Sequence, residues 1–506
     1  MIKRPSHLPR TVPNTRRFTA NLRHDMMKGT IRVFLGEALL LPTGLLTAAF
    51  LTRKLAPEGY GLFTVAATMV AWVEWSISAT FSRATFKLIG EADDWRPIAA
   101  AVARLHLVLG GVTAVTLWLC ADLIASLFKA PALGSYLRLF AIDIPIFSLA
   151  QAHRSILVGI GAFHQRATVT AVRWMARLLF IVILVQTGLS IPGAIIGSIG
   201  ASFVELACCR FWVRPPLVGR ISFPLRQLWN YAVPLLLYAA SMRLLDKVDL
   251  FMLQGLRGSA ADTGIYGAAQ NITLVAGLFA LSFSPLLLST LSHMLRSGEV
   301  DLARRTGRDA LRVVTGMLPF AAMTSGAAQE IAVCVFGETF RPAAIPLALL
   351  IVGSVGFVAI SVVTAILTAA GRPRSTVMLT APLVFASIAG NLWLIPRMGT
   401  LGAATVTTIV GGIGALAAVV TLHRLWDVGV PTATLARSLV ISAGAYVSAA
   451  TWPVTGFLFL ALKLSVIGVA VLLGFFALGE FNATELNGLR TMFRRQAALN
   501  EDASPL

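Results

Sequence analysis

Long apolar segments alternate with short polar ones along nearly the whole chain. A helix needs roughly 20 mostly apolar residues to cross a bilayer. Fourteen segments meet this condition, at about 30–52, 61–82, 98–120, 136–158, 168–187, 191–211, 229–253, 264–292, 310–334, 343–369, 375–395, 399–421, 434–452 and 455–478. The pattern therefore predicts an all-α polytopic membrane protein with 14 transmembrane helices.

Several landmarks of this pattern occur twice. Each copy of a Tyr-Gly pair opens a long apolar segment, and glycines recur at the ends of spans four and ten and at the starts of spans six and twelve. The matched pairs are Tyr60-Gly61 with Tyr266-Gly267, Gly161 with Gly371, and Gly193-Ala194 with Gly402-Ala403. Six spans separate the Tyr-Gly copies, so both lie on the same side and the repeat is parallel, about an axis along the membrane normal.

The repeat divides the chain into two lobes and an addition. We expect a first six-helix lobe at 30–215, a second at 216–425, and two C-terminal helices at 426–480 that have no counterpart. A basic tail at 1–29 and a tail at 481–506 complete the predicted organisation. A cleft between two such lobes is typical of a transporter.

Composition and charge agree with a membrane protein. Hydrophobic residues make up 57% and charged residues 13%, whereas a soluble domain carries about 25% charged residues. The net charge is +19, yet no nucleic-acid motif or basic stretch interleaved with aromatics occurs. Most of the 42 Lys and Arg fall in loops on one side of the predicted topology, which places both termini in the cytoplasm.

The first predicted loop reads Leu55-Ala56-Pro57-Glu58-Gly59-Tyr60-Gly61 and leads into an apolar helix. With twelve spans in two lobes and two further spans, the chain resembles the multidrug/oligosaccharidyl-lipid/polysaccharide exporter superfamily. Within it the chain is similar to polysaccharide flippases of the O-antigen type. The resemblance implies a multi-pass protein of the bacterial inner membrane that moves an undecaprenyl-pyrophosphate-linked oligosaccharide to the outer leaflet.

The resemblance also implies partners and a lipid site. The partners would be the polyprenyl-pyrophosphate-linked glycan, membrane lipids, and the polymerase and export machinery of surface polysaccharide or exopolysaccharide. In the lipid II flippases of the superfamily, the two last spans form a groove for the lipid tail. A similar groove is expected here, with Lys463 of span fourteen near the head group; the alternative is that Lys463 snorkels or pairs.

An anionic pyrophosphate cannot cross hydrocarbon unless protein groups replace its water and meet its charge. We therefore expect a cationic central cavity and alternating access. Arg173 and Arg177 lie four residues apart on span five, on one helical face, and arginine suits bidentate phosphate contacts. They are the first candidates for substrate binding. The alternative is an interhelical pair with Glu205 or Glu74.

Span seven carries a second charged group, with Arg243, Asp246, Lys247 and Asp249 within seven residues. Arg243 can pair with Asp246 one turn away, which would leave Lys247 for substrate. Arg243 and Lys247 are therefore further substrate candidates, and Asp246 and Asp249 are candidates for coupling or gating. The alternative is a self-neutralised polar patch.

Glu37 in span one and Glu74 in span two complete the coupling candidates. The repeat places Glu37 at a position comparable with Arg243, so the two can instead form a packing pair. A desolvated carboxylate in a membrane can carry a proton or a sodium ion. No other cofactor and no metal are expected, since none of the four cysteines shows metal-ligand spacing. Asp143 is a further buried charge.

Two other functions compete with the flippase. A cation-coupled multidrug exporter has the same fold, but the four basic candidates favour an anionic substrate. A membrane polymerase or glycosyltransferase usually needs a sizeable outer loop with acidic or His residues, and the predicted outer loops are short and contain no His. No nucleophile motif and no Gly-rich phosphate loop occurs. The sequence therefore predicts a transporter and not an enzyme.

Overall fold

A computed structural model describes residues 39–92, 94–216 and 247–480. Over these residues the chain is helical and contains no strand. The first half holds α2 (Leu40–Glu91), α3 (Arg96–Leu127), α4 (Pro131–Ala141), α5 (Asp143–Gly159), α6 (Phe163–Leu184) and α7 (Ser190–Trp212). The second half holds helical residues 247–257, then α9 (Ala260–Arg296), α10 (Val300–Thr315), α11 (Leu318–Gly326), α12 (Ala328–Phe336), α13 (Ala344–Ala369), α14 (Pro373–Met398), α15 (Thr400–Trp426), α16 (Thr432–Thr451) and α17 (Phe457–Ala477).

The prediction of an all-helical membrane protein is confirmed. Ten of the described helices are long and apolar enough to cross a membrane, or eleven when α10–α12, bent by 66°, counts as one span. Helix occurs at the position of each predicted span except most of the seventh, which lies largely outside the described residues. Two of the ten, Leu40–Ser78 and Phe163–Trp212, each cover two predicted spans, and α2 alone would measure about 78 Å at helical rise.

The first of these long helices is broken inside the predicted first loop. Ala56 has φ 56° and ψ 176°, well outside helical geometry. The break lies directly before Pro57, whose ring disfavours a helical conformation of the preceding residue. Pro57 then takes the first helical position of the following segment, where its missing N–H costs nothing. Spans one and two are thus separated where the sequence predicted a loop.

The repeat is visible in matching turns. Gly161 and Gly371 both have positive φ, 78° and 75°, and both end a helix with the same pair of backbone bonds. The residue after each glycine donates to a carbonyl five residues back, at 2.8 Å and 2.9 Å, which is the Schellman arrangement. Ser190 has φ 50° and ψ −131°, and its counterpart Gly399 has φ 58° and ψ −128°. The two copies therefore share local backbone geometry.

The structure divides into two compact units whose borders differ from the predicted lobes. Residues 67–121 and 135–243 belong to the first unit, whereas 48–66, 122–134 and 244–506 belong to the second. The segment around Tyr60 therefore packs with the second half of the chain. Helices α16 and α17 belong to the same second unit.

Small residues bring helices of the first unit together. A Cβ at Gly197 of α7 would meet the backbone N of Ile181 of α6 at 2.8 Å, and one at Gly200 would meet the ring of Phe180 at 2.9 Å. Close approach of this kind is how membrane helices gain packing contacts without a hydrophobic driving force. It holds α6 against α7, which positions the charged side chains of both helices.

The two Tyr-Gly motifs meet inside the second unit. A Cβ at Gly61 would lie 1.8 Å from the carbonyl oxygen of Ala260, and one at Gly264 would lie 2.0 Å from that of Pro57. Only glycine allows backbones to approach this closely. The crossing thus joins the first loop to the start of α9. In the second motif, the glycine in close contact is Gly264, which lies three residues before Gly267.

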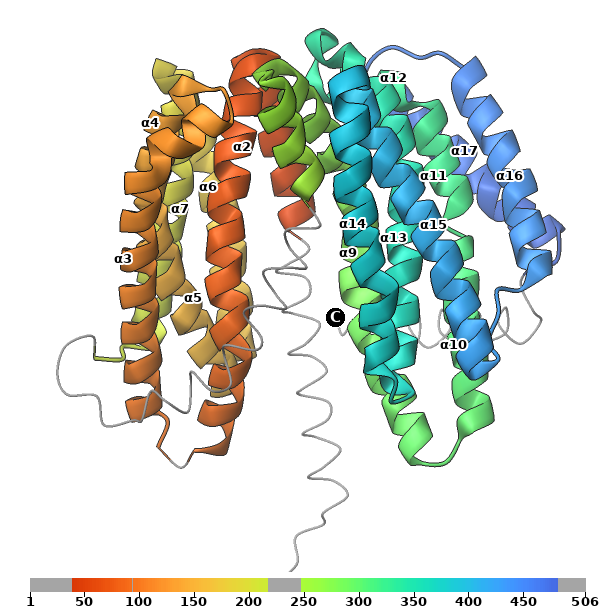
Figure 1. Cartoon of the computed structure of the whole chain (residues 1–506), viewed down its shortest axis with the longest axis horizontal. Coiled ribbons are helices and arrows are strands. Elements are labelled where there is room, and N and C mark those ends of the chain that lie inside the picture. Colours follow the sequence, from red (N-terminus) through yellow and green to blue (C-terminus); the bar gives the residue numbers. More distant parts are fainter. Residues whose placement is uncertain (1–38, 93, 217–246, 481–506) are drawn as a thin grey trace, which may run out of the picture. The chain divides into compact units, whose positions relative to one another are not determined.

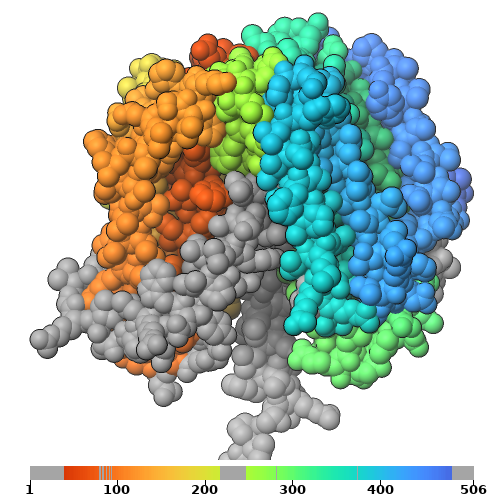
Figure 2. All heavy atoms as spheres, in the orientation of Figure 1, coloured from red at the N-terminus to blue at the C-terminus, as the bar shows by residue number. Residues whose placement is uncertain are grey.

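The last two helices are packed into the core of the second unit. Ala445 and Ala449 of α16 and Leu460 and Phe475 of α17 share one buried cluster with Tyr266 of α9. Outward-facing positions are apolar. Figure 2 shows α14 and α15 at the surface of the second unit, and exposed side chains there include Met378, Phe385, Trp393, Ile413 and Leu416. An apolar exterior is expected where lipid is the solvent.

Candidate functional site

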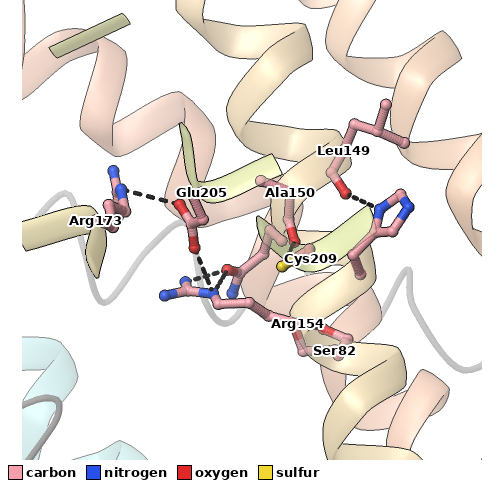
Figure 3. Close-up of polar contacts among 10 residues, drawn as sticks. Ser82, Leu149, Ala150, Arg154, Arg173, Glu205 and Cys209 are labelled. Carbon is pink, nitrogen blue, oxygen red and sulfur yellow. Dashed lines mark hydrogen bonds and ion pairs between the residues drawn. The ribbon is translucent and has the colours of Figure 1, made fainter. Parts of the chain in front are cut away.

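The first unit holds a buried carboxylate between two arginines. Glu205 of α7 is fully buried, and its Oε1 lies 3.1 Å from Nε of Arg154 on α5. Its Oε2 lies 3.0 Å from Nε of Arg173 on α6. Figure 3 shows the two guanidinium groups at different oxygens of Glu205, with Arg173 to the left of the carboxylate and Arg154 below it. Three helices therefore contribute one charged side chain each to this site.

The two arginines are held differently. Arg154 also donates to Oε1 of Gln151 one turn earlier on α5. Arg173 lies over the ring of Phe147, with its Cζ 4.5 Å from the ring centroid, and beside Trp174 at 5.2 Å. Stacking on aromatic faces suits the planar guanidinium. It leaves the N–H groups, which lie in the guanidinium plane, able to donate hydrogen bonds. Each arginine side chain keeps some exposure, 12% and 13%.

Two further carboxylates belong to this charged cluster. Glu74 of α2 and Asp143 of α5 are buried, 7% and 3% exposed. Glu74 interacts electrostatically with Asp143, Arg173, Arg177 and Glu205. One carboxylate oxygen of each has no hydrogen-bond partner among the described residues. Buried polar atoms without partners are rare and costly in native proteins, and they mark strained or functional sites.

Arg177 lies one turn after Arg173 on the same face of α6, as the sequence predicted. Its Cζ is 5.8 Å from the centroid of Trp174. Three arginines and three carboxylates therefore form one cluster, which we call the first-unit charge cluster: Arg154, Arg173, Arg177, Glu74, Asp143 and Glu205. The alternative pairing of Arg173 with Glu205 is present in the structure.

The second unit also contains a buried carboxylate, held by neutral groups. Oδ2 of Asp249 accepts from the hydroxyl of Tyr266 at 2.5 Å and from that of Thr407 at 3.0 Å. The side-chain amide of Gln270 donates to both oxygens at 3.1 Å, and the backbone N–H of Leu250 donates to Oδ1 at 2.7 Å. Asp249 thus has every oxygen satisfied by uncharged donors.

Lys247 and Tyr266 lie beside this carboxylate, and Tyr60 contacts Asn271, the residue after Gln270. Nζ of Lys247 donates to Oε1 of Gln270 at 2.9 Å, so Gln270 connects it to Asp249. Tyr266 is fully buried, and its counterpart Tyr60 accepts a hydrogen bond from Asn271 at 2.7 Å. Both tyrosines therefore use their hydroxyls inside the protein, in keeping with a packing role for the Tyr-Gly pairs.

Lys463 lies in an ion pair. Its side chain is fully buried in α17, and its Nζ lies 2.8 Å from Oε1 of Glu330 on α12. This contact is the pairing that the sequence analysis gave as one alternative for Lys463. A role of Lys463 beside a lipid tail stays a prediction.

A second ion-pair group holds the end of α17. Glu480, just past α17, accepts from Arg312 of α10 at 2.5 Å and from Arg437 of α16 at 2.8 Å. The hydroxyl of Thr434 donates to it at 2.6 Å. Burial favours the neutral acid, but these three donors outweigh burial and hold the pKa of Glu480 below its usual value of 4.5.

Three predicted site residues lie outside the described residues: Glu37, Arg243 and Asp246. Their roles stay predictions. Arg154 was missed because its place near the end of span four assigned it to the cytoplasmic edge. Its spacing of three residues from Gln151 was the available signal for a polar helix face. Thr407 and Glu330 gave no signal, because single polar residues in apolar helices are common.

The family comparison concerns residues 50–345, which match the model of the polysaccharide biosynthesis protein family. Among curated proteins, no match to the chain is found. Solved structures supply the fold. The lipid II flippase MurJ in an inward closed conformation has a TM-score of 0.71 and 15% identity, covering 88% of this chain and 97% of that one.

Two transporters share the fold as well. An inward-facing multidrug resistance transporter of the MATE family has a TM-score of 0.63 and 15% identity, covering 77% of this chain and 96% of its own. A transporter of the MOP superfamily from Pyrococcus furiosus Vc1, described by the reverse polarity of its binding pocket, has a TM-score of 0.58 and 15% identity, covering 83% and 96%. The chain thus belongs to the polysaccharide biosynthesis protein family and has the fold shared by MurJ and the MATE transporters.

Proposed function

We propose that the protein is a flippase for a lipid-linked oligosaccharide. It moves an undecaprenyl-pyrophosphate-linked glycan from the inner to the outer leaflet of the bacterial cytoplasmic membrane, for assembly of surface polysaccharide or exopolysaccharide. Transport proceeds by alternating access. Both termini lie in the cytoplasm, and the product passes to the polymerase and export machinery.

The observation that carries this proposal is the first-unit charge cluster. Arg154, Arg173 and Arg177 gather within the apolar part of the chain, where a positive charge is costly unless it serves a purpose. Arg154 and Arg173 remain partly exposed and are thus reachable by a ligand. Guanidinium groups bind phosphate oxygens in pairs, which suits a diphosphate. Membership of a polysaccharide biosynthesis family supports the glycan part of the substrate.

Proton or sodium coupling is part of the proposal. Glu74 and Asp143 offer buried carboxylate oxygens that have no hydrogen-bond partner in the part of the chain that the structure describes, whereas Asp249 is saturated by donors. The first unit is therefore the better place for a coupling carboxylate. The same feature suits the alternative function, a cation-coupled multidrug exporter, because buried carboxylates can also meet a cationic drug.

One experiment separates these functions. Deletion of the gene should abolish surface polysaccharide and leave the lipid-linked unit on the inner leaflet. Restoring the gene as Arg173→Ala should lower polysaccharide at least about tenfold, since a buried charge-assisted contact is lost. Arg173→Lys should restore part of it, because lysine keeps the charge but not the fork.

The matched control is Arg257→Ala. Arg257 pairs with Asp262 at 3.5 Å, and both side chains are well exposed, 39% and 29%. Exposed pairs contribute little, so this variant should make polysaccharide at the wild-type level. Unchanged polysaccharide in the deletion strain, together with new sensitivity to cationic drugs, would overturn the flippase in favour of the exporter.

A further inference from the structure

Glu205 contacts the same cationic groups that a phosphate would bind. Its two oxygens each face the Nε of a different arginine, and the side chain itself is fully buried. Arg173 makes this one ion pair and stacks on aromatic rings, but it makes no hydrogen bond within the described part of the chain. A guanidinium carries five N–H donors, so Arg173 is largely unused in this state.

Within the described part of the chain, the charges of the cluster are balanced. Three arginines face three carboxylates there, so an arriving diphosphate would add negative charge to a buried site. An excess buried charge is strongly unfavourable. The diphosphate therefore competes with a carboxylate of the cluster for its arginines.

We infer that Glu205 is a built-in competitor of the substrate diphosphate, holding Arg154 and Arg173 until the diphosphate displaces it. The diphosphate itself rests on the proposed function, whereas the competition rests on the contacts of Glu205. No covalent bond changes in this exchange, because the two ion pairs pass from the carboxylate oxygens to phosphate oxygens.

The groups that surround Glu205 leave it as the carboxylate that must yield. Among the described residues, Glu74 and Asp143 form no ion pair, and they attract Arg173 and Arg177 only at longer range. Glu205 loses both of its partners. The charged and titratable groups that interact with Glu205 come from four helices: Glu74 on α2, Asp143 and Arg154 on α5, Arg173 on α6, and Cys208 and Cys209 on α7. Arg177 of α6 interacts with Glu74 and Asp143.

A purely structural ion pair would behave differently. Glu330 with Lys463 is such a pair: buried, close at 2.8 Å, and part of the second unit. Removing a structural carboxylate weakens the protein and leaves anion affinity unchanged. Removing a competitor frees two arginines and raises anion affinity. Glu330→Gln is therefore the matched control for Glu205→Gln.

The test is binding of inorganic pyrophosphate to the full-length protein in lipid nanodiscs, measured by titration calorimetry. Glu205→Gln should bind about tenfold more tightly than wild type, which corresponds to about 1.4 kcal/mol. Glu330→Gln should bind as wild type does. Tryptophan fluorescence gives a second reading, and Trp174→Phe identifies the share of the signal that comes from beside Arg173.

Clear results would overturn the inference. They are equal or weaker pyrophosphate binding by Glu205→Gln, or an equal gain in Glu330→Gln. If Glu205→Gln does not fold, Glu205→Asp keeps the charge but shortens the reach, and its affinity should rise to an intermediate value; no rise refutes the competition. If Glu205→Gln binds pyrophosphate more tightly but deletion of the gene leaves surface polysaccharide unchanged, the role of Glu205 as a competitor stands and the flippase function is rejected.

Discussion

Glu205 and Asp249 are both carboxylates buried in apolar helices, one in each unit, yet their surroundings are opposite. Glu205 faces two arginines and forms ion pairs at 3.0 Å and 3.1 Å. Asp249 faces a tyrosine, a threonine, a glutamine and a backbone N–H, all neutral. An arginine can exchange its carboxylate for another anion. Neutral donors that are fixed by packing cannot move to a new anion in this way. The comparison separates an exchangeable carboxylate from a structural one.

This difference also separates the roles of the two units. In the second unit, polar groups join helices that are far apart in sequence, and Thr407 lies 158 residues from Asp249. In the first unit, the polar groups leave carboxylate oxygens of Glu74 and Asp143 without hydrogen bonds. A hydrogen-bond network in which every buried polar group has a partner makes a structure rigid. A network that leaves groups without partners can exchange partners more easily.

The largest effect that tests this contrast is expected for Asp249→Asn. The variant removes a charge that four donors support and places an amide N–H₂ against the donors of Tyr266 and Gln270. We expect a loss of about 3 kcal/mol in stability, because donor groups are left buried without acceptors. The apparent melting temperature in detergent measures it. Pyrophosphate affinity should stay as in wild type, and a tenfold gain like that of Glu205→Gln would erase the distinction.

A smaller effect is expected where the two Tyr-Gly motifs cross. Gly264→Ala would place a Cβ about where the carbonyl oxygen of Pro57 lies, so the two segments must separate. Overpacking of this kind costs about 2 kcal/mol. Gly277→Ala is the matched control on the same helix, with nothing within 4 Å, and should be neutral or slightly stabilising. Equal melting temperatures for the two variants would show that the backbones at the crossing are not in close contact.

The smallest effect is expected at Glu480, an ion-pair group outside the spans. Its pKa lies below 4.5, so the charged form contributes stability above that pH, and this contribution fades as the pH falls through the lower folded value. Glu480→Gln should cost about 1 kcal/mol at pH 7. Its melting temperature should change less than that of wild type between about pH 5 and pH 3. Parallel pH profiles would contradict this.

The site was only partly predictable from the sequence. The two arginines of α6 were found because depth in an apolar segment and four-residue spacing are local properties. The partnership of Arg173 with Arg154 was not, because the spacing within each helix gives no information about which faces of α5, α6 and α7 meet. The saturation of Asp249 was equally hidden, since its donors come from α9 and α15.

Lys463 is a second residue whose partner could not be predicted from the sequence. Its position in an apolar helix was compatible with a groove beside lipid, with snorkelling or with an ion pair. Glu330 lies 133 residues away on a helix that is part of a bent span, and only the packing of α17 against α12 brings the two side chains together. The addition of two spans was predictable, and its attachment to the second unit was not.

The sequence by itself determined the helical membrane fold and its parallel repeat. Apolar length, glycine turns and the proline at residue 57 act over a few residues, so they can be read without the rest of the chain. The tertiary structure decided which charges meet. A buried charge takes the partner that helix packing brings within about 3–4 Å, and in this protein that contact makes Glu205 exchangeable and Asp249 fixed.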